Sequence, residues 1–86
     1  MHHIYVLYSF KFDKIYIGES SNLGDRFISH NLDTNNGWTG RYRPWALIYA
    51  EKCQGKSAAL KREKQLKSAS ARRWIWDEII INLTKT

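Results

Sequence analysis

Tyr16, Arg26 and His30 lie within one short stretch of the sequence and supply a phenol, a guanidinium and an imidazole. Arg26 and His30 are four residues apart, so that on a helix they lie one above the other on the same face. A guanidinium can anchor phosphate, and an imidazole can move protons near neutral pH. A single histidine is more often structural than catalytic, and the pairing with Arg26 is what favours a functional interpretation.

Glu63 is the acidic residue with the most informative position. It lies in a segment rich in strong helix formers, Ser57 to Lys67, for which Ser57 is the predicted N-cap. On a helix Glu63 shares a face with Ala59 and Leu66, which should pack on a sheet. A carboxylate there is costly unless it is paired, hydrogen-bonded or bound to a metal. The alternative is a slightly rotated helix in which Glu63 is solvated among its basic neighbours.

Two segments near the N-terminus predict a β-hairpin. Ile4 to Phe10 is a short apolar and aromatic run, which favours a buried strand. Lys14 to Ile17 alternates with a period of two, and Gly18 is expected to end that strand. The connection is predicted around Lys11 to Lys14.

Tyr5 and Tyr16 fall on these two strands. If both side chains point to one face of the hairpin, two phenols stand close together. The alternative is that each is an ordinary core or sheet-surface tyrosine, which is the commoner case for any tyrosine taken alone.

The rest of the chain predicts one further strand and two helices besides the one from Ser57 to Lys67. The predicted elements are a helix from about Leu23 to His30, an irregular exposed loop from Asn31 to Pro44, a strand from Trp45 to Ala50, and a helix from Ala71 to about Asn82. Ser20 or Ser21 is expected to cap the first of these helices. The last helix has two candidate apolar rows, Ile75–Ile79–Asn82 and Trp76–Ile80–Leu83. Together they predict one α+β domain over residues 1–86, with a small three-stranded antiparallel sheet and about three helices.

The composition points to an anionic partner. Among 86 residues, 14 are Lys or Arg and 8 are Asp or Glu, so the formal net charge is +6 and the pI is near 9.7. Nucleic acid is the commonest partner of so basic a small domain. No membrane-spanning run, signal peptide or lipidation signal is visible, and Cys53 is the only cysteine, so a cytoplasmic protein without disulfides is expected.

Basic side chains are candidates for contact with phosphate. Arg72 and Arg73 are expected in the first turn of the last helix, where the helix dipole disfavours cations and bound phosphate would offset that cost. The alternative is that the basic residues only keep a small protein soluble. The candidate DNA-binding residues are Lys14, Arg41, Arg43, Arg62, Arg72, Arg73 and Asn82.

The ordered set of motifs resembles the GIY-YIG nuclease domain over nearly the whole chain. The resemblance rests on Tyr5 within His3-Ile4-Tyr5, on Tyr16-Ile17-Gly18, and on Arg26, His30 and Glu63 in this order. The segments around Arg26 and Glu63 are most similar to the small stand-alone bacterial members. His3 departs from the family pattern, which has glycine there, and Glu19 adds an acid beside the second motif.

The resemblance implies a role for each motif residue. Tyr5 and Tyr16 would lie beside the scissile phosphate, Arg26 would stabilise its charge, and His30 would help to move protons. Glu63 would hold a single Mg²⁺ or Mn²⁺, since a hard ion that keeps its waters needs few protein ligands. Asn82 is a candidate for the asparagine that many members carry in their last helix.

The leading hypothesis is a metal-dependent DNA endonuclease or nickase, with structure selectivity and delivery by a separate targeting protein as further expectations. The alternative is a nucleic-acid-binding module whose nuclease site is inactive. A third hypothesis is a protein-interaction domain that uses its four tryptophans, Trp38, Trp45, Trp74 and Trp76, as contact surface.

Overall fold

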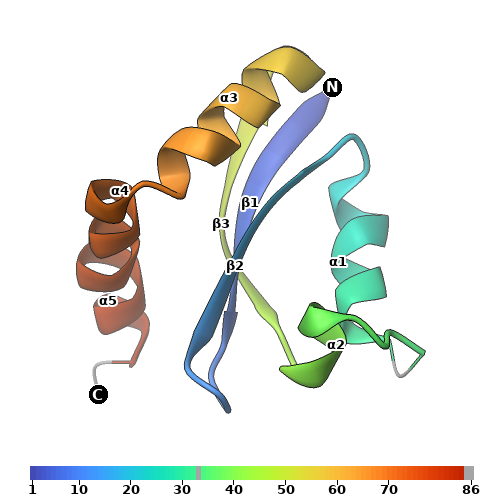
Figure 1. The fold of residues 1–86 in the computed structure, drawn as a ribbon, viewed down its shortest axis with the longest axis vertical. Coiled ribbons are helices and arrows are strands. Elements are labelled where there is room, and N and C mark those ends of the chain that lie inside the picture. The colour runs from blue at the N-terminus through green and yellow to red at the C-terminus, as the bar shows by residue number, and fades with distance from the viewer. Residues whose placement is uncertain (33, 85–86) are drawn as a thin grey trace.

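A three-stranded antiparallel sheet lies between two layers of helices in the computed structural model, which describes residues 1–32 and 34–84 (Figure 1). The strand order is β2-β1-β3, and the strands are β1 (His2–Ser9), β2 (Lys14–Ser20) and β3 (Ala46–Cys53). The helical segments are α1 (Leu23–Asn31), α2 (Trp38–Arg41), α3 (Lys56–Leu66), α4 (Ala69–Trp74), η1 (Ile75–Ile80) and α5 (Ile81–Thr84). The predicted α+β class and three-stranded antiparallel sheet are confirmed.

The central strand β1 is buried on both faces, which explains why its sequence is a continuous apolar run and does not alternate. It pairs antiparallel with β2 through a four-residue turn, residues 10–13. Asp13 adopts a φ of 55°, and its N–H donates to the Ser9 carbonyl at 2.7 Å. The Tyr8 hydroxyl donates to Asp13 Oδ1 at 2.6 Å, so the predicted hairpin is closed by side chains as well as by backbone.

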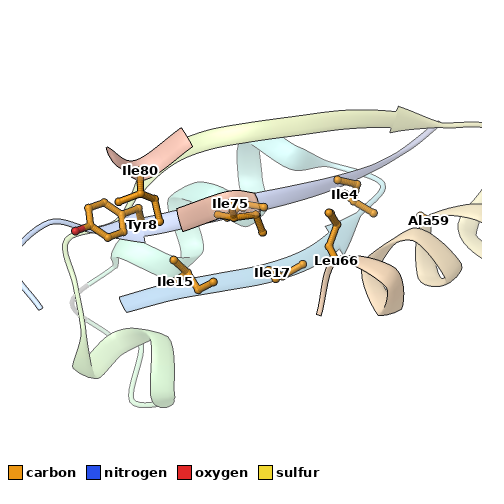
Figure 2. Close-up of a cluster of buried hydrophobic side chains, with 9 residues drawn as sticks. Ile4, Tyr8, Ile15, Ile17, Ala59, Leu66, Ile75 and Ile80 are labelled. Carbon is orange, nitrogen blue, oxygen red and sulfur yellow. The ribbon is translucent and has the colours of Figure 1, made fainter. Parts of the chain in front are cut away.

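One face of the sheet packs against α3 and the helical run α4–η1–α5. Alternate residues of β1 and β2 meet apolar side chains of these helices, as Figure 2 shows. The members of this core are Ile4, Val6, Tyr8, Ile15, Ile17, Ala59, Leu66, Ile75 and Ile80. The opposite face carries Tyr5 and Leu7 and is covered by α1, α2 and Trp45.

The predicted end of β2 and the predicted caps of α1 and α3 are wrong. β2 continues through Gly18 to Ser20, because Gly18 pairs with Tyr5 across the hairpin and has no unusual backbone angles. Asn22, and not Ser20 or Ser21, caps α1, and its Oδ1 accepts from the Asp25 N–H at 3.1 Å. α3 begins after Gly55 without a side-chain cap, so Ser57 lies inside the helix.

The last helix also departs from its prediction. It begins at Ala69 with Ser68 as its cap, so Arg72 and Arg73 lie near the end of α4 and not in its first turn. Its middle, η1, is a π-helical turn, which brings residues five apart onto one face. Ile75 and Ile80 are therefore the two buried residues, and neither predicted apolar row is the one that packs on the sheet.

The predicted irregular, exposed loop from Asn31 to Pro44 contains the short helix α2, in which Thr39 and Gly40 are buried. The prediction is therefore wrong over α2. The Asn31 side chain exchanges two hydrogen bonds with the backbone of Trp45, and so ties the end of α1 to the start of β3. Over residues 1–32 and 34–84, no helix is both long and apolar enough to cross a membrane.

We expect Leu66→Ala to lower the free energy of unfolding by about 2–5 kcal/mol, because Leu66 is fully buried where α3 meets the sheet. Leu60→Ala makes the same change on the same helix at an exposed position, and should alter the free energy of unfolding by about 0.5 kcal/mol or less. Urea unfolding followed by circular dichroism measures both variants. Equal losses would contradict this packing of α3.

Candidate active site

Tyr5 and Tyr16 share the face of the sheet that α1 and α2 cover. In the hairpin register Tyr5 lies opposite Gly18 and Leu7 lies opposite Tyr16, which makes the two tyrosines diagonal neighbours. Their ring centroids are 6.2 Å apart. The hairpin therefore brings the two phenols together, and Tyr5 is completely buried while Tyr16 is partly exposed.

Gly18 makes room for the Tyr5 ring. A Cβ atom at Gly18 would lie 2.6 Å from Tyr5 Oη and 2.9 Å from Tyr16 Cε2, closer than side-chain atoms can approach. Glycine is needed at this position because the two phenols leave no room for a side chain. The predicted reason, backbone freedom at the end of a strand, does not apply.

Helix α1 brings Arg26 and His30 to the same two phenols. Leu23 and Phe27 pack into the core on this face and so fix the rotation of the helix. His30 is buried, its Nε2 lies 2.9 Å from Tyr5 Oη in a hydrogen bond, and its ring centroid is 4.8 Å from that of Tyr16.

The guanidinium of Arg26 lies among these groups but stays open to solvent. Hydrogen bonding to the Tyr5 phenol, and more weakly to that of Tyr16, raises the pKa of Arg26 against the opposing effect of burial. We call Tyr5, Tyr16, Arg26 and His30 the phenol cluster.

The charges of the phenol cluster at neutral pH follow from its burial. Burial and the neighbouring Tyr16 raise the pKa of Tyr5 to about 12, despite the opposing contribution of Arg26. Burial and then the charge of Arg26 lower the pKa of His30 from its ordinary value. Tyr5 therefore keeps its proton and His30 is neutral, while Arg26 carries the positive charge.

Glu63 approaches from the other helical layer. It lies on the face of α3 that also carries the buried Ala59 and Leu66, and its side chain is only 20% exposed. The Lys67 ammonium pairs with it at 2.8 Å, and its negative charge contributes to the raised pKa of Tyr5. Glu63 therefore lies on the packed face of α3, and its partner is one of its basic neighbours, Lys67.

Glu63 offers a hard cation one carboxylate ligand, which is of the right chemical kind but binds only weakly by itself. Among the described residues, no three His, Cys, Asp or Glu side chains come together around a common point for a metal. Mg²⁺ keeps several of its waters and is commonly held by one or two carboxylates together with substrate phosphate oxygens. A single carboxylate whose partner Lys67 lines a basic groove fits that chemistry.

The outer edge of β2 borders a groove of about 470 Å³ between the two helical layers. We call it the edge groove. It joins Tyr16 on one side to basic residues of the α3–α4 region on the other, and its lining residues are Asp13, Lys14, Ile15, Tyr16, Ile17, Trp38, Lys67, Arg72 and Trp76. The partly exposed tyrosine of the phenol cluster is therefore accessible from an open, basic surface.

Two of the seven candidate DNA-binding residues, Lys14 and Arg72, line the edge groove. Arg41 and Arg43 line a second hollow beside α2, where Arg43 also donates to the Leu32 carbonyl at 2.7 Å. Arg73 is exposed on α4.

The remaining two candidates are engaged elsewhere. The guanidinium of Arg62 holds both carboxylate oxygens of Glu51, at distances between 2.8 and 3.2 Å. The Asn82 amide donates to the Glu78 carbonyl within its own helix at 2.6 Å. Neither lines the edge groove or the second hollow.

Two neighbours of the site were not assigned by the sequence. Lys67 pairs with Glu63, and the spacing of four residues on a helix was the signal for it. Glu19 is bonded to His2, with His2 Nδ1 2.9 Å from Glu19 Oε2. Because strand residues alternate, Glu19 faces the α3 layer with Ile17, away from the phenol cluster.

Residues 1–75 match the family model of the GIY-YIG catalytic domain. The chain belongs to the GIY-YIG family. This family is a nuclease family, and the domain's match includes every member of the phenol cluster and Glu63. The expected resemblance is confirmed.

Small proteins from bacteria and an archaeon are similar to this GIY-YIG chain. UPF0213 proteins of Staphylococcus haemolyticus and Staphylococcus saprophyticus are 32% and 36% identical to it over 69 residues, covering 80% of this chain and 83% of each relative. A UPF0213 protein of Natronomonas pharaonis is 33% identical over 69 residues, covering 80% of both chains. No solved structure gives a significant match.

We expect Gly18→Ala to lower the free energy of unfolding by about 1–3 kcal/mol, because the added methyl group collides with the buried Tyr5 phenol. Gly24→Ala is the matched control, since its Cβ meets only Asn22 Oδ1 at 4.0 Å and alanine favours a helix. Urea unfolding measures stability, and tyrosine ring signals in NMR report the cluster. A neutral Gly18→Ala would contradict the geometry around Tyr5.

We expect His30 to titrate below about 6.5, the ordinary histidine value, because its pKa is lowered in the fold. Above that pH both folded and unfolded chains hold a neutral His30, and its contribution to stability is complete. As pH falls below about 6.5, the unfolded chain binds the proton first and stability is lost.

NMR titration of the histidine Cε1–H signals tests this, with His30→Gln to assign the His30 signal. Urea unfolding between pH 7 and pH 5 should show a smaller acid loss in His30→Gln than in the unmodified protein. A midpoint at or above 6.5 for His30 would show that burial and the charge of Arg26 do not lower its pKa as the fold requires.

Proposed function

We propose that this protein is a metal-dependent endonuclease or nickase that hydrolyses phosphodiester bonds in DNA. One observation carries the proposal: Tyr5, Tyr16, Arg26 and His30 converge from three elements on one face of the sheet, beside a basic groove. The net charge of +6 favours a polyanionic substrate. We expect the DNA to lie along the edge groove, with Lys14 and Arg72 against its phosphates.

Arg26 is suited to stabilise the charge that develops on the phosphoryl oxygens. It carries the positive charge beside the neutral Tyr5 and His30, and it stays open to solvent. A fixed donor of this kind needs no rearrangement when charge develops, which is where electrostatic catalysis gains most. Tyr16 borders the groove and can orient the phosphate or the attacking water.

Tyr5 and His30 form a route for a proton. With a pKa of about 12, Tyr5 does not give up its proton to solvent at neutral pH. Its hydroxyl donates to neutral His30 through their 2.9 Å hydrogen bond, in the tautomer that leaves Nε2 free, so a proton that reaches the Tyr5 oxygen can be replaced by one passed on to the imidazole. The lowered pKa of His30 keeps the imidazole available as the acceptor.

Glu63 is the residue that would hold Mg²⁺ or Mn²⁺. A bound ion supplies Lewis-acid stabilisation of the phosphate and of the leaving oxygen. Glu63 would give up its ion pair with Lys67 to do so, and a half-exposed ion pair of this kind is worth at most about 1 kcal/mol. Lys67 lines the edge groove and would then face the DNA. We further propose a cytoplasmic location and delivery to its target by a separate protein.

Cleavage of DNA tests the proposal. Supercoiled plasmid and end-labelled single-stranded, branched and duplex DNA are incubated with Mg²⁺, Mn²⁺ or EDTA. We expect metal-dependent nicking that falls by at least about a hundredfold in Glu63→Gln and in Tyr16→Phe. Glu78→Gln makes the same chemical change at an exposed carboxylate on η1 and should retain full activity.

Equal cleavage by all four proteins would identify a contaminating nuclease and contradict the proposal. Tight, salt-sensitive binding without cleavage under any metal would instead support the nucleic-acid-binding module.

A further inference from the structure

We propose that the exposed face of the Trp38 indole is a stacking site for one unpaired nucleobase, so that single-stranded or branched DNA is the favoured substrate. This inference rests on the proposed DNA nuclease function and names its substrate class. It starts from the contrast between two neighbouring tryptophans: Trp45 is 4% exposed, whereas Trp38 is 50% exposed and is part of the same aromatic group.

Trp38 forms the wall between two hollows of the surface. It lines the edge groove, and it also lines the second hollow together with Arg41 and Arg43. Its ring centroid lies 6.4 Å from that of Tyr16. A base stacked on this indole therefore belongs to a nucleotide close to the phosphate that Tyr16 would contact.

The indole is held in place by aromatic neighbours on its inner side. The ring centroids of Tyr42 and Trp45 lie 4.9 Å and 5.9 Å from that of Trp38. Trp45 is itself fixed, because its Nε1–H donates to the Thr39 carbonyl at 2.7 Å. The indole thus has three ring neighbours, Tyr16 included, and still keeps half of its surface exposed.

The short helix α2 that carries Trp38 is also fixed. The Asn35 amide donates to Thr39 Oγ1 at 2.8 Å, and the Asn35 side-chain oxygen accepts from the Gly37 N–H at 3.0 Å. The backbone of Asn35 passes so close to Gly40 that a Cβ there would lie 1.8 Å from the Asn35 carbonyl oxygen. A large apolar surface that is both exposed and rigid binds a flat ligand with little loss of conformational entropy.

The charge around Trp38 suits a nucleic acid strand. Lys14 and Arg72 lie along the edge groove and Arg41 along the second hollow, so that cations are present on both sides of the indole. Asp13, the acidic residue that lines the edge groove, already accepts the Tyr8 hydroxyl. A backbone that crosses from one hollow to the other would pass its phosphates by these cations while a base covers the ring.

Stacking on an aromatic side chain selects for unpaired bases. In a duplex the faces of each base are covered by its neighbours in the stack, whereas a single strand, a branch point or an end offers them freely. Base–aromatic stacking tolerates any sequence, since every base has a π-face. The proposal therefore predicts preference for DNA structure without preference for sequence.

Binding without turnover tests this inference. Fluorescence anisotropy at fixed salt is measured with Glu63→Gln as the background, using a labelled 12-mer of thymidine, an abasic 12-mer of the same charge, and a blunt 12-base-pair duplex. The variants are Trp38→Phe, which keeps a ring, and Trp38→Leu, which keeps apolar bulk alone. Trp74→Ala is the control, because Trp74 is 41% exposed on α4 and lines neither hollow.

We expect Trp38→Leu to weaken binding of the thymidine 12-mer by about tenfold, and Trp38→Phe by about threefold or less. Binding of the abasic strand and of the duplex should change by less than about twofold in either variant, and Trp74→Ala should match the background protein. Equal affinity of the Trp38→Leu and Trp38→Phe variants for the thymidine strand would overturn the stacking site, as would an equal loss with the abasic strand.

The outcome separates the two proposals. If the protein cleaves no DNA but its single-strand affinity depends on the ring at Trp38, the nuclease function fails and the stacking site stands. If it cleaves DNA but the Trp38 variants bind like Trp74→Ala, the nuclease function stands and the stacking site fails. In that second case the exposed indole would serve another contact, such as one with a protein.

Discussion

The approach of the Tyr5 ring to Gly18 is the constraint on which the site depends. Tyr5 is fully buried in the central strand, and it reaches His30 because nothing projects from β2 at Gly18. The same missing side chain lets Tyr16 lie beside Tyr5. Any larger residue would displace both phenols together, so the pairing of β1 with β2 positions the site as well as the sheet.

Burial then determines the charges of the phenol cluster. It raises the pKa of Tyr5 and lowers that of His30, so two groups that could carry charge are both neutral at pH 7. Arg26 is left as the exposed cation of the phenol cluster. The negative charge of Glu63 comes from the opposite helical layer, on the far side of the sheet from α1. The charged groups of the site thus come from both helical layers, Arg26 from α1 and Glu63 from α3.

The two helical layers are also what makes the edge of β2 a groove. α2 contributes Trp38 to one wall, and the α3–α4 region contributes Lys67 and Arg72 to the other. An unpaired strand edge on a small basic protein would otherwise invite pairing with another chain, and here it is flanked by cations and bulky rings. The same flanks give the groove its positive charge and its exposed aromatic face.

The sequence by itself determined the sheet, the hairpin and the identity of the family. The signals for these features are local: alternation, apolar runs and the order of the motif residues along the chain. They can be read from the sequence without knowledge of the tertiary structure. The motif residues are Tyr5, Tyr16, Arg26, His30 and Glu63. Long-range packing decided the rest. Whether Gly18 ends a strand or clears space depends on Tyr5 thirteen residues earlier in the chain. Whether Ile79 or Ile80 is buried depends on a π-helical turn that fits η1 to the sheet. Contacts with other parts of the chain also decide which tryptophan is buried and which arginine is already paired. Trp45 is fixed by its hydrogen bond to Thr39, and Arg62 is paired with Glu51. No local sequence pattern encodes these contacts.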